Sequence, residues 1–386
     1  MRIVHTSDWH AGRIWKSLNR LNEIAAALDH LAQFIEREKV DLLLHSGDVF
    51  DHSLPMADAE KVVFDFLKRV GRSGTKTILI AGNHDFPPRM EAWATLTELV
   101  DVHTVARPVA PERGGVLSVP TRSGERAIAA ALPFTSVGML LSAMDIAATD
   151  GSGYASYADA IRNMIHILSA QFRSESVNLL IAHTHIEEAI LAGSERKATV
   201  GKEWAATPQA LPPAAHYVAL GHVHKPQRVE AAPAPTYYGG SILQMDFAEA
   251  GEQKSFVYVE ARPGKPAKIR RIAYEGTVPL TRVSLDFAEL QKLAEGLRHE
   301  GYLEVTVKLE KHDSDINSKV RKMVPNAVSV RQEYPEQQEE VRLHRRGLAP
   351  AELYSLYHRG QYSAEPSERI LRAFQELYHL VESGPQ

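Results

Sequence analysis

Five short motifs rich in aspartate, asparagine and histidine constrain this chain more than any other feature. Each motif follows a short apolar run, and the run at 41–45 is nearly continuous, which is typical of a strand buried on both faces. Because ligands of open α/β sheets bind at the carboxyl ends of the strands, we expect the motifs to converge. In chain order they are Asp8-Trp9-His10, Gly47-Asp48, Gly82-Asn83-His84-Asp85, His183 and Gly221-His222-Val223-His224.

Strands and helices alternate over the first two thirds of the chain. Residues 19–38 carry apolar side chains three and four apart, which predicts an amphipathic helix, and a second helix is expected at 57–72. The alternation predicts a largely parallel sheet with helices on its faces, which antiparallel strands at 236–272 would close. The strands expected before that region are 2–6, 41–45, 77–81, 127–132, 177–182 and 216–220.

The residue types in the motifs point to metal binding. Carboxylate, amide oxygen and imidazole together suit Mn, Fe or Zn, whereas a site made only of oxygens would suit Mg or Ca. Six or seven candidate ligands are too many for one ion. They are about the right number for two ions that share a carboxylate, roughly 3.5–4 Å apart. The glycines before Asp48, Asn83 and His222 fit tight turns that let the backbone leave a strand sharply.

Each motif also has a structural interpretation. A single Asp-Trp-His or Gly-His-Val-His could be a loop accident, and Gly-Asn-His-Asp could simply be a favourable turn. Five accidents in this order, each after a predicted strand, are improbable. We favour His183 over His185 as a ligand because His183 stands where its apolar strand ends. The histidines at positions 5, 30, 45 and 103 have no such pattern around them, and we expect them to be structural.

Composition excludes several classes of chemistry. The chain has no cysteine, so disulfides, thiolate metal sites and cysteine nucleophiles are absent. It has no phosphate-binding loop of the Gly-x-x-x-x-Gly-Lys-Ser/Thr type, so no ATP site is expected on this chain. No apolar leader or membrane span is evident, which favours the cytoplasm. The net charge of −4 does not exclude nucleic acid, because bound metal cations offset phosphate repulsion. Basic clusters at 265–271 and 342–346 are either solvated surface or local anion contacts.

The pattern changes near residue 276, and we expect three domains: 1–275, 276–340 and 341–386. The second would be a small α/β unit, followed by a polar connector at 335–340. The tail from 348 has the pattern of two short helices broken by Gly360. In the small unit we expect a strand from 281, a helix at 287–299, a strand at 302–309, a helix at 314–324 and a strand at 327–333. The last helix of the tail carries an apolar stripe of Ile370, Phe374, Leu377 and Val381.

The five motifs match, in order, those of the calcineurin-like metallophosphoesterases. Residues 5–10, 47–51 and 237–247 further resemble the SbcD family of bacterial DNA nucleases, and the small α/β unit and helical tail resemble that family's DNA-capping domain and partner-binding helices. Two positions depart from the pattern. Ala248 stands where glycine is usual. Asp51 stands where some relatives have a histidine, whose role cannot be transferred to Asp51 or to neighbouring His52.

The resemblance implies an α/β fold, in which mixed β-sheets flanked by helices form a sandwich with a capping domain and a helical tail. It also implies two metal sites joined by Asp48. His84 would stabilise the transition state or protonate the leaving oxygen. Asp85 would either orient His84 or only form the turn. The first metal would be bound by Asp8, His10, Asp48 and His224, and the second by Asp48, Asn83, His183 and His222.

The function implied is a manganese-dependent DNA nuclease, with magnesium as another possible metal. It would be a double-strand exonuclease and a single-strand or hairpin endonuclease, acting in DNA repair, recombination and replication. The chain would form a homodimer that binds DNA and, through its C-terminal helices, an SbcC-type coiled-coil ATPase, in the cytoplasm near the nucleoid. Alternatives are a phosphoprotein phosphatase, a nucleotide phosphodiesterase, a scaffold on the same fold, and a nuclease acting without ATP. The apolar stripe could instead pack on its own domain, which we consider somewhat less favoured than the partner.

Overall fold

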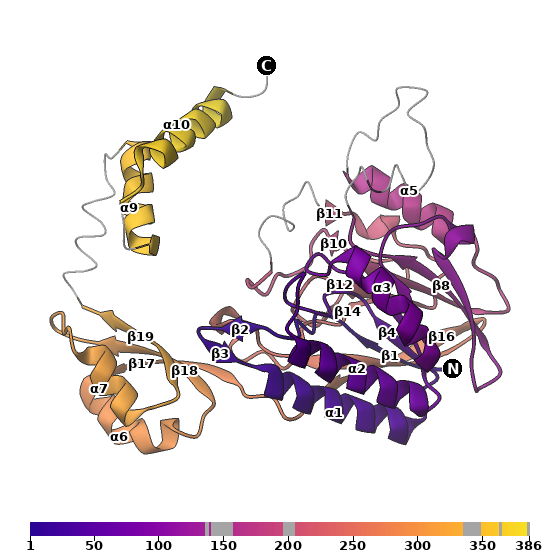
Figure 1. Ribbon diagram of the computed structural model, residues 1–386, viewed down its shortest axis with the longest axis horizontal. Helices are drawn as coiled ribbons and strands as arrows, with labels where there is room; N and C mark the ends of the chain where they lie inside the picture. The colour runs from indigo at the N-terminus through magenta and orange to yellow at the C-terminus, as the bar shows by residue number, and fades with distance from the viewer. Residues whose placement is uncertain (136–138, 140–156, 196–204, 335–348, 363–364, 384–386) are drawn as a thin grey trace. The chain divides into compact units, whose positions relative to one another are not determined.

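The computed structural model describes residues 1–135, 139, 157–195, 205–334, 349–362 and 365–383 (Figure 1). The chain divides into two compact units, Met1–Thr281 and Arg282–Gln386. Among the described residues, no helix is long and apolar enough to cross a membrane.

Two six-stranded sheets form the first unit, and both mix parallel with antiparallel pairs. The order of the first sheet is β16 (Lys265–Ala273), β15 (Ser255–Arg262), β1 (Arg2–Thr6), β4 (Leu42–His45), β5 (Lys76–Ile80) and β6 (Val102–Val105). The order of the second is β13 (Gln227–Arg228), β14 (Thr236–Tyr238), β12 (Tyr217–Gly221), β9 (Val177–His183), β8 (Arg126–Leu132) and β7 (Val116–Pro120). Two short pairs complete the unit: β2 (Ile14–Trp15) with β3 (Leu18–Asn19), and β10 (His185–Ile186) with β11 (Ala205–Ala206).

The expectation of one largely parallel sheet was wrong, whereas the sandwich of mixed sheets is confirmed. Strands β1, β4, β5 and β6 run parallel in the first sheet, and β8, β9, β12 and β14 run parallel in the second. Antiparallel strands lie at the edges, as in β15 with β16 and β7 with β8. A strand buried on both faces has the same apolar run in either sheet, so the pattern could not assign strands to sheets.

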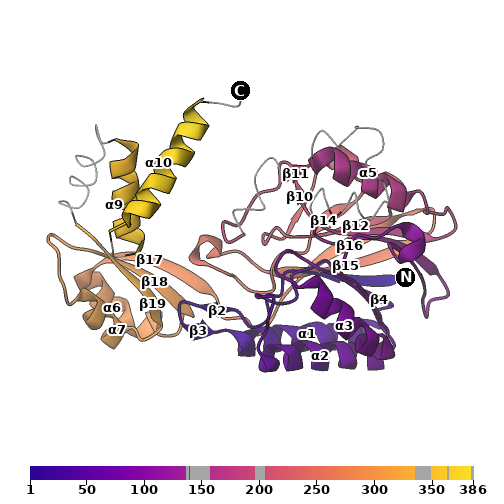
Figure 2. The same cartoon turned by 45° about the horizontal axis from the view of Figure 1, so that its top comes forward.

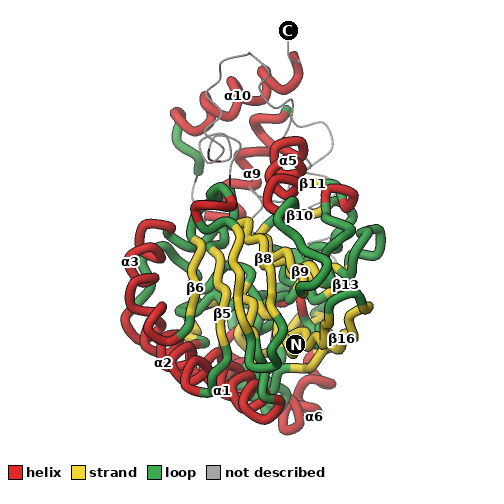
Figure 3. Tube along the Cα trace, turned by 90° about the vertical axis from the view of Figure 1, so that its right-hand side faces the viewer, coloured by secondary structure: helices red, strands yellow, loops and turns green. Residues whose placement is uncertain are grey.

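The core of the first unit has three apolar layers. The layer between the two sheets contains Ile3, Leu44, Leu179 and Ala219, all fully buried. Helices α1 and α2 cover the outer face of the first sheet, and α5 covers the second (Figures 2 and 3). The helices are α1 (Leu21–Glu38), α2 (Ala57–Arg72), α3 (Pro87–Thr97) and α5 (Tyr157–Ser169), with 3-10 turns η1 (Glu98–Val100), η2 (Pro111–Arg113), η5 (Pro208–Ala210) and η6 (Phe247–Glu249).

Apolar spacing predicted the long helices well and the short elements poorly. The five apolar residues that define the stripe of α1 are all buried, as their spacing requires. No pattern predicted α3, whose only buried side chains are Met90 and Thr97 and which starts with two prolines. Without an inward-facing apolar stripe, such a helix leaves no periodic signal.

The second unit contains a three-stranded sheet and two tail helices. Strands β18 (Tyr302–Lys308) and β19 (Ala327–Glu333) are parallel, and β17 (Leu280–Asp286) lies on the other side of β18. Helices α6 (Phe287–Leu297) and α7 (Ile316–Met323) bury Leu290 and Val320 against this sheet, in the predicted element order. The tail forms α9 (Pro350–Tyr362) and α10 (Glu368–Ser383). Gly360 therefore lies inside α9, and the predicted break there was wrong because one glycine in a helix is tolerated.

Several predictions fall outside the described residues. The polar connector at 335–340, the basic cluster at 342–346 and the predicted limit between residues 340 and 341 all lie there. The other basic cluster, 265–271, belongs to β16 at the edge of the first sheet, and its lysine and arginine side chains are exposed.

His5 joins the two sheets in the interior. Its Nδ1 lies 2.8 Å from the hydroxyl of Tyr217 on β12, and its Nε2 lies 2.8 Å from Oγ of Ser46 after β4. The ring is fully buried, and burial lowers the pKa of His5 to about 3. The predicted structural role of His5 agrees with these contacts.

We predict that His5 makes the fold sensitive to acid. The unfolded chain binds a proton at this ring below about pH 6.5 and the folded chain only near pH 3, so stability falls as the pH drops between those values. From pH 7 to 5 the loss due to His5 should be about 2 kcal/mol. Urea unfolding of wild type and His5→Gln at both pH values measures it, with His166→Gln on α5 as control. Equal losses in wild type and His5→Gln would contradict the prediction.

Candidate metal centre

The predicted ligands come from the carboxyl ends of strands in both sheets. Asp8 and His10 follow β1, Asp48 follows β4, and Asn83 follows β5, all in the first sheet. The second sheet supplies the other ligands, with His183 at the end of β9 and His222 and His224 after β12. The expected convergence therefore occurs, and it joins the two layers of the sandwich.

Four of these residues have a left-handed backbone. The φ angles are 49° at Asp8, 46° at His10, 56° at Asp48 and 98° at His222. Residues other than glycine rarely adopt positive φ, although Asp and His tolerate it better than most. Such strained positions cluster at functional sites when the surrounding structure holds them. Here they turn the side chains inward at the point where each strand ends.

The glycines at the strand ends allow the two sheets to approach closely. A Cβ on Gly82 would collide with the carboxylate and backbone of Asp48, and one on Gly221 would collide with the carbonyl of Ser46. Only Gly47 of the three has a positive φ, at 98°, and a Cβ there would also meet His183. Close packing, more than turn geometry, therefore explains Gly82 and Gly221.

The ligand atoms gather in overlapping groups. Within each group the nearest ligand atoms lie within 4.8 Å of one another. Nε2 of His10 lies 3.2 Å from Nε2 of His224, and Oδ1 of Asn83 lies 2.8 Å from Nδ1 of His222. His185, which lies on β10, belongs to none of the groups found among the described residues. The groups are Asp8, His10 and His224; Asp8, Asp48 and His183; and His10, Asp48 and His84.

The donor and acceptor pattern at His183 fits a bound cation. Its Nδ1 donates to the carbonyl of Ser46 at 2.7 Å, and burial lowers its pKa, so the neutral ring presents a lone pair at Nε2. That lone pair faces Oδ1 of Asn83 at 3.0 Å and Oδ2 of Asp48 at 3.6 Å, both acceptors. Three acceptors directed at one another repel unless a cation lies between them.

The buried carboxylates also indicate a bound cation. Burial, together with the neighbouring Asp48 carboxylate, raises the pKa of Asp8 well above its ordinary value. The Asp8 carboxylate is also held in place, because it accepts the backbone N–H of His222 from the other sheet at 3.1 Å. Carboxylate, amide oxygen and imidazole in one buried cluster fit divalent metals.

His84 and Asp85 have different surroundings from those expected for a directly coupled pair. Nδ1 of His84 lies 2.8 Å from the backbone carbonyl of Asp51, which orients the ring, and its backbone N–H donates to Asp48. The Asp85 carboxylate accepts the backbone N–H groups of Gly82, Val49 and Phe50 at 2.9–3.2 Å. Asp85 therefore does not orient His84 by a hydrogen bond. Its contacts match the turn-forming alternative.

Two residues that sequence reasoning left unassigned also contact the site. Oδ1 of Asp51 lies 3.2 Å from Nδ1 of His10 and 3.0 Å from the guanidinium of Arg13. Burial opposes the charge of Asp51, but His10 and Arg13 outweigh it and hold its pKa below the ordinary range. Phe134, just beyond the end of β8, stacks on the ring of His222, with the two ring centres 6.1 Å apart. The sequence signal that could have found Phe134 is its position just after a buried strand.

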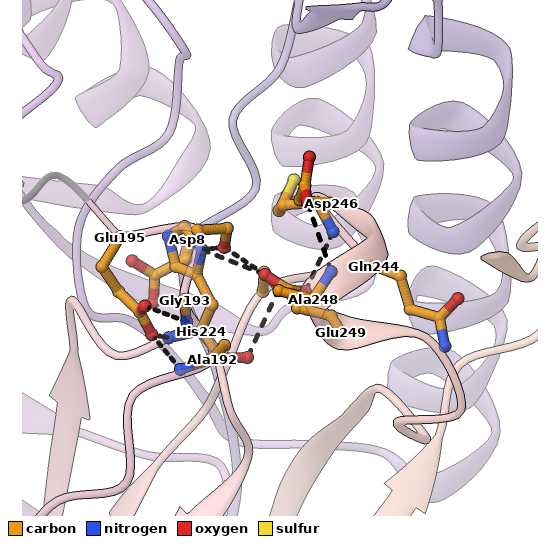
Figure 4. Close-up of polar contacts among 12 residues, drawn as sticks. Asp8, Ala192, Gly193, Glu195, His224, Gln244, Asp246, Ala248 and Glu249 are labelled. Carbon is orange, nitrogen blue, oxygen red and sulfur yellow. Dashed lines mark hydrogen bonds and ion pairs between the residues drawn. The ribbon is translucent and has the colours of Figure 1, made fainter. Parts of the chain in front are cut away.

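A second polar group lies behind His224 (Figure 4). Glu249 is fully buried, and its carboxylate lies 2.6 Å from the ammonium of Lys254. Burial alone would raise the pKa of Glu249, but the contacts with His224 and Lys254 lower it to about 2. Glu195 accepts the backbone N–H of His224 at 3.1 Å. No motif marked these residues, because they are polar partners that lie far apart in the sequence.

Comparison with known proteins identifies the family. Residues 1–226, more than half of the chain, match the calcineurin-like phosphoesterase family. Two curated relatives, both named as the SbcD subunit of the SbcCD nuclease, are 29% identical over 389 residues (Bacillus subtilis, 99% of each chain) and 30% identical over 316 residues (Rhodobacter capsulatus, 76% of each chain). The chain is a calcineurin-like phosphoesterase of the SbcD family.

Two further conclusions follow from membership of the SbcD family. As a calcineurin-like phosphoesterase the chain uses divalent metals, and its clustered aspartates and histidines are candidates to hold them. Residues 276–361 match a second family model, described as the type 5 capsule protein repressor C-terminal domain and abbreviated SbcD_C. The similarity to the SbcD family thus continues beyond the catalytic unit.

We predict that Asp85 contributes mainly to stability. Asp85→Ala would leave three buried N–H groups without their acceptor, at about 1–3 kcal/mol for each group left unpaired. We expect a loss of at least about 2 kcal/mol in the free energy of unfolding. Urea unfolding measures it, with exposed Asp58→Ala on α2 as control. Unchanged stability with lost phosphoesterase activity would instead support the alternative role of Asp85 in orienting His84 for catalysis.

Proposed function

We propose that this chain is the nuclease subunit of an SbcCD-type complex and cuts DNA with two manganese ions. The cluster of acceptors at the meeting point of both sheets is the observation that carries the proposal. A relative of matching length, named as the SbcD subunit of the SbcCD nuclease, supports a nucleic acid as the substrate. Double-strand exonuclease and single-strand or hairpin endonuclease activities, in repair, recombination and replication, belong to the same proposal.

The proposed ligand sets follow the geometry. The Nε2 atoms of His10 and His224 are 3.2 Å apart. Asn83 contacts both His183 and His222 through its Oδ1. Asp48 contacts both groups, with Oδ2 at 3.7 Å from His10 and 3.6 Å from His183. That position suits the carboxylate shared by two metals, which when bound would activate water and neutralise charge at the phosphorus.

His84 is placed to handle a proton at the edge of this cluster. Its Nδ1 is engaged by the carbonyl of Asp51, which accepts only, so Nδ1 carries a hydrogen and Nε2 is left for the substrate. His84 is partly exposed, unlike the buried histidines of the cluster. A second proton, on Nε2, would be the one given to the leaving oxygen of the cleaved strand.

We predict metal-dependent cleavage of DNA. The purified chain should cut labelled linear and hairpin DNA with Mn²⁺, and chelator should abolish cutting. Asp48→Ala and His84→Ala should each reduce the rate of DNA cleavage by at least about 100-fold, because a general acid usually contributes that much to the rate. His166→Ala on α5 serves as the matched control, and Mg²⁺ replaces Mn²⁺ in a parallel series. Hydrolysis of a small phosphodiester with DNA left intact would instead favour a phosphatase or nucleotide phosphodiesterase.

The proposed partner of the tail is a coiled-coil ATPase of the SbcC type. In the tail, Phe374 of α10 stacks on Tyr354 of α9 with ring centres 4.3 Å apart, so part of the predicted stripe packs against α9. Ile370 and Leu377 remain 39% and 63% exposed, which leaves apolar surface on α10 for a partner. The side chain of Val381 lies outside the described residues.

We also predict a change in hydrogen exchange of the tail helix α10 when the ATPase binds. Without the ATPase, the amides of α10 should exchange rapidly in hydrogen-exchange mass spectrometry, because two small helices bury little apolar surface. Adding the ATPase should protect them, and Leu377→Glu should weaken the complex while exposed Gln375→Glu leaves it intact. Strong protection of α10 in the isolated chain would contradict the partner role.

The remaining parts of the proposal are assembly and location. We propose a homodimer, supported by Leu96 on α3 and Leu99 in η1, which are 68% and 82% exposed and suit an apolar contact between copies. Light scattering of the purified chain tests this point. The cytoplasm near the nucleoid, where the DNA substrate lies, is the proposed location.

A further inference from the structure

His224 has its two ring nitrogens in different surroundings. Nε2 faces the metal-ligand cluster, 3.2 Å from Nε2 of His10. Nδ1 points to the opposite side, where it lies 2.5 Å from Oγ of Ser194. A neutral imidazole carries its hydrogen on one nitrogen only, so the partner of Nδ1 decides whether Nε2 offers a lone pair to a metal.

Ser194 in turn contacts a carboxylate. Its hydroxyl donates to Oε1 of Glu249, whereas Nδ1 of His224 lies 3.6 Å from the same oxygen, too far for a direct hydrogen bond. A hydroxyl has one hydrogen. Because that hydrogen goes to Glu249, the bond between Ser194 and His224 must use the hydrogen on Nδ1. This polarity leaves the lone pair of His224 on Nε2.

Glu249 is fixed as an acceptor by two further groups. The ammonium of Lys254 lies 2.6 Å from its Oε2, and the backbone N–H of Met245 donates to the same oxygen at 2.9 Å. Lys254 also donates to the backbone carbonyl of His224 at 2.9 Å. Both Glu249 and Lys254 are buried. The group therefore contacts His224 at its ring and at its backbone.

The loop that carries Ser194 is held separately. Glu195 accepts the backbone N–H groups of Ala192 and Gly193 at 2.8 and 2.7 Å and that of His224 at 3.1 Å (Figure 4). The Glu195 carboxylate thus connects the loop before Ser194 to the backbone of His224, the residue that the Ser194 hydroxyl contacts. The arrangement determines the position of the hydroxyl from two directions.

We propose that Ser194 and Glu249 form a positioning relay that fixes His224 as the Nδ1–H tautomer, with Nε2 directed to the metal. The relay rests on the proposed role of His224 as a metal ligand. It gives a function to the segment 244–249 and to the loop at 192–195, neither of which supplies a proposed ligand. Hydrogen-bond partners behind a ligating histidine typically change metal affinity by about 10–100-fold.

The test uses the full chain and two measurements. Long-range proton–nitrogen NMR of the metal-free protein reports the tautomer of His224, assigned by its loss in His224→Asn. Calorimetric titration with Mn²⁺ reports affinity. We expect the Nδ1–H form in wild type, a mixture of tautomers in Ser194→Ala, and Mn²⁺ binding about 10–100-fold weaker in both Ser194→Ala and Glu249→Gln.

Two variants serve as matched controls. Ser194→Thr keeps the hydroxyl and should behave as wild type. Glu252→Gln alters the other carboxylate partner of Lys254, at 2.9 Å, and should also keep the affinity. Wild-type tautomer and affinity in Ser194→Ala would overturn the relay, as would an equal loss in Glu252→Gln. A wild-type protein that binds no Mn²⁺ would defeat the proposed function, while the metal-free tautomer would still decide the relay.

Discussion

The structure of the first unit depends on one constraint, which is that acceptor atoms from two sheets meet in a buried space. Asp8 and Asp48 come from the first sheet, and His183 directs a lone pair at them from the second. Acceptor atoms directed at one another repel without a cation. Burial, together with the neighbouring Asp48 carboxylate, also raises the pKa of Asp8 well above its ordinary value. A bound divalent ion would replace this repulsion with attraction between the two sheets. Metal binding and the packing of the sandwich are therefore linked, and bound metal should stabilise the fold by mass action.

Other contacts in the first unit fix the positions of the two sheets so that these acceptor atoms lie close together. His5 and Tyr217 join the layers by a hydrogen bond, and the carboxylate of Asp8 accepts an N–H from the strand end at His222. Gly82 and Gly221 leave no side chain where the strand ends approach each other. These contacts are polar or steric, whereas the apolar layer around them is non-directional. The apolar layer supplies most of the stabilisation, and the polar contacts set the relative position of the strand ends.

Sequence could bring the candidate ligands together because they share a local signal, an acidic, amide or imidazole side chain at the end of an apolar run. It could not predict which sheet each run joins, because the runs before Asp48 and His183 look alike. It also left Asp51 unassigned and missed Ser194 and Glu249, because their contacts form only once the fold is complete. Ser194 lies 30 positions from His224 and 55 from Glu249 along the chain. For Asp85 the sequence left two roles open, orienting His84 or forming the turn, and its contacts match the turn-forming role.

The histidines of the cluster are held in chemically different ways, and this difference has consequences. His183 and His84 donate to the backbone carbonyls of Ser46 and Asp51, which side-chain substitution cannot remove. His10 and His224 instead face side chains: Nδ1 of His10 lies 3.2 Å from the Asp51 carboxylate, and Nδ1 of His224 lies 2.5 Å from the Ser194 hydroxyl. Both of these histidines belong to the ligand set proposed for the first metal. If the proposed ligand sets hold, substitutions outside the ligands would change the affinity of the first metal, whereas the fold itself would set the orientation of His183 at the second.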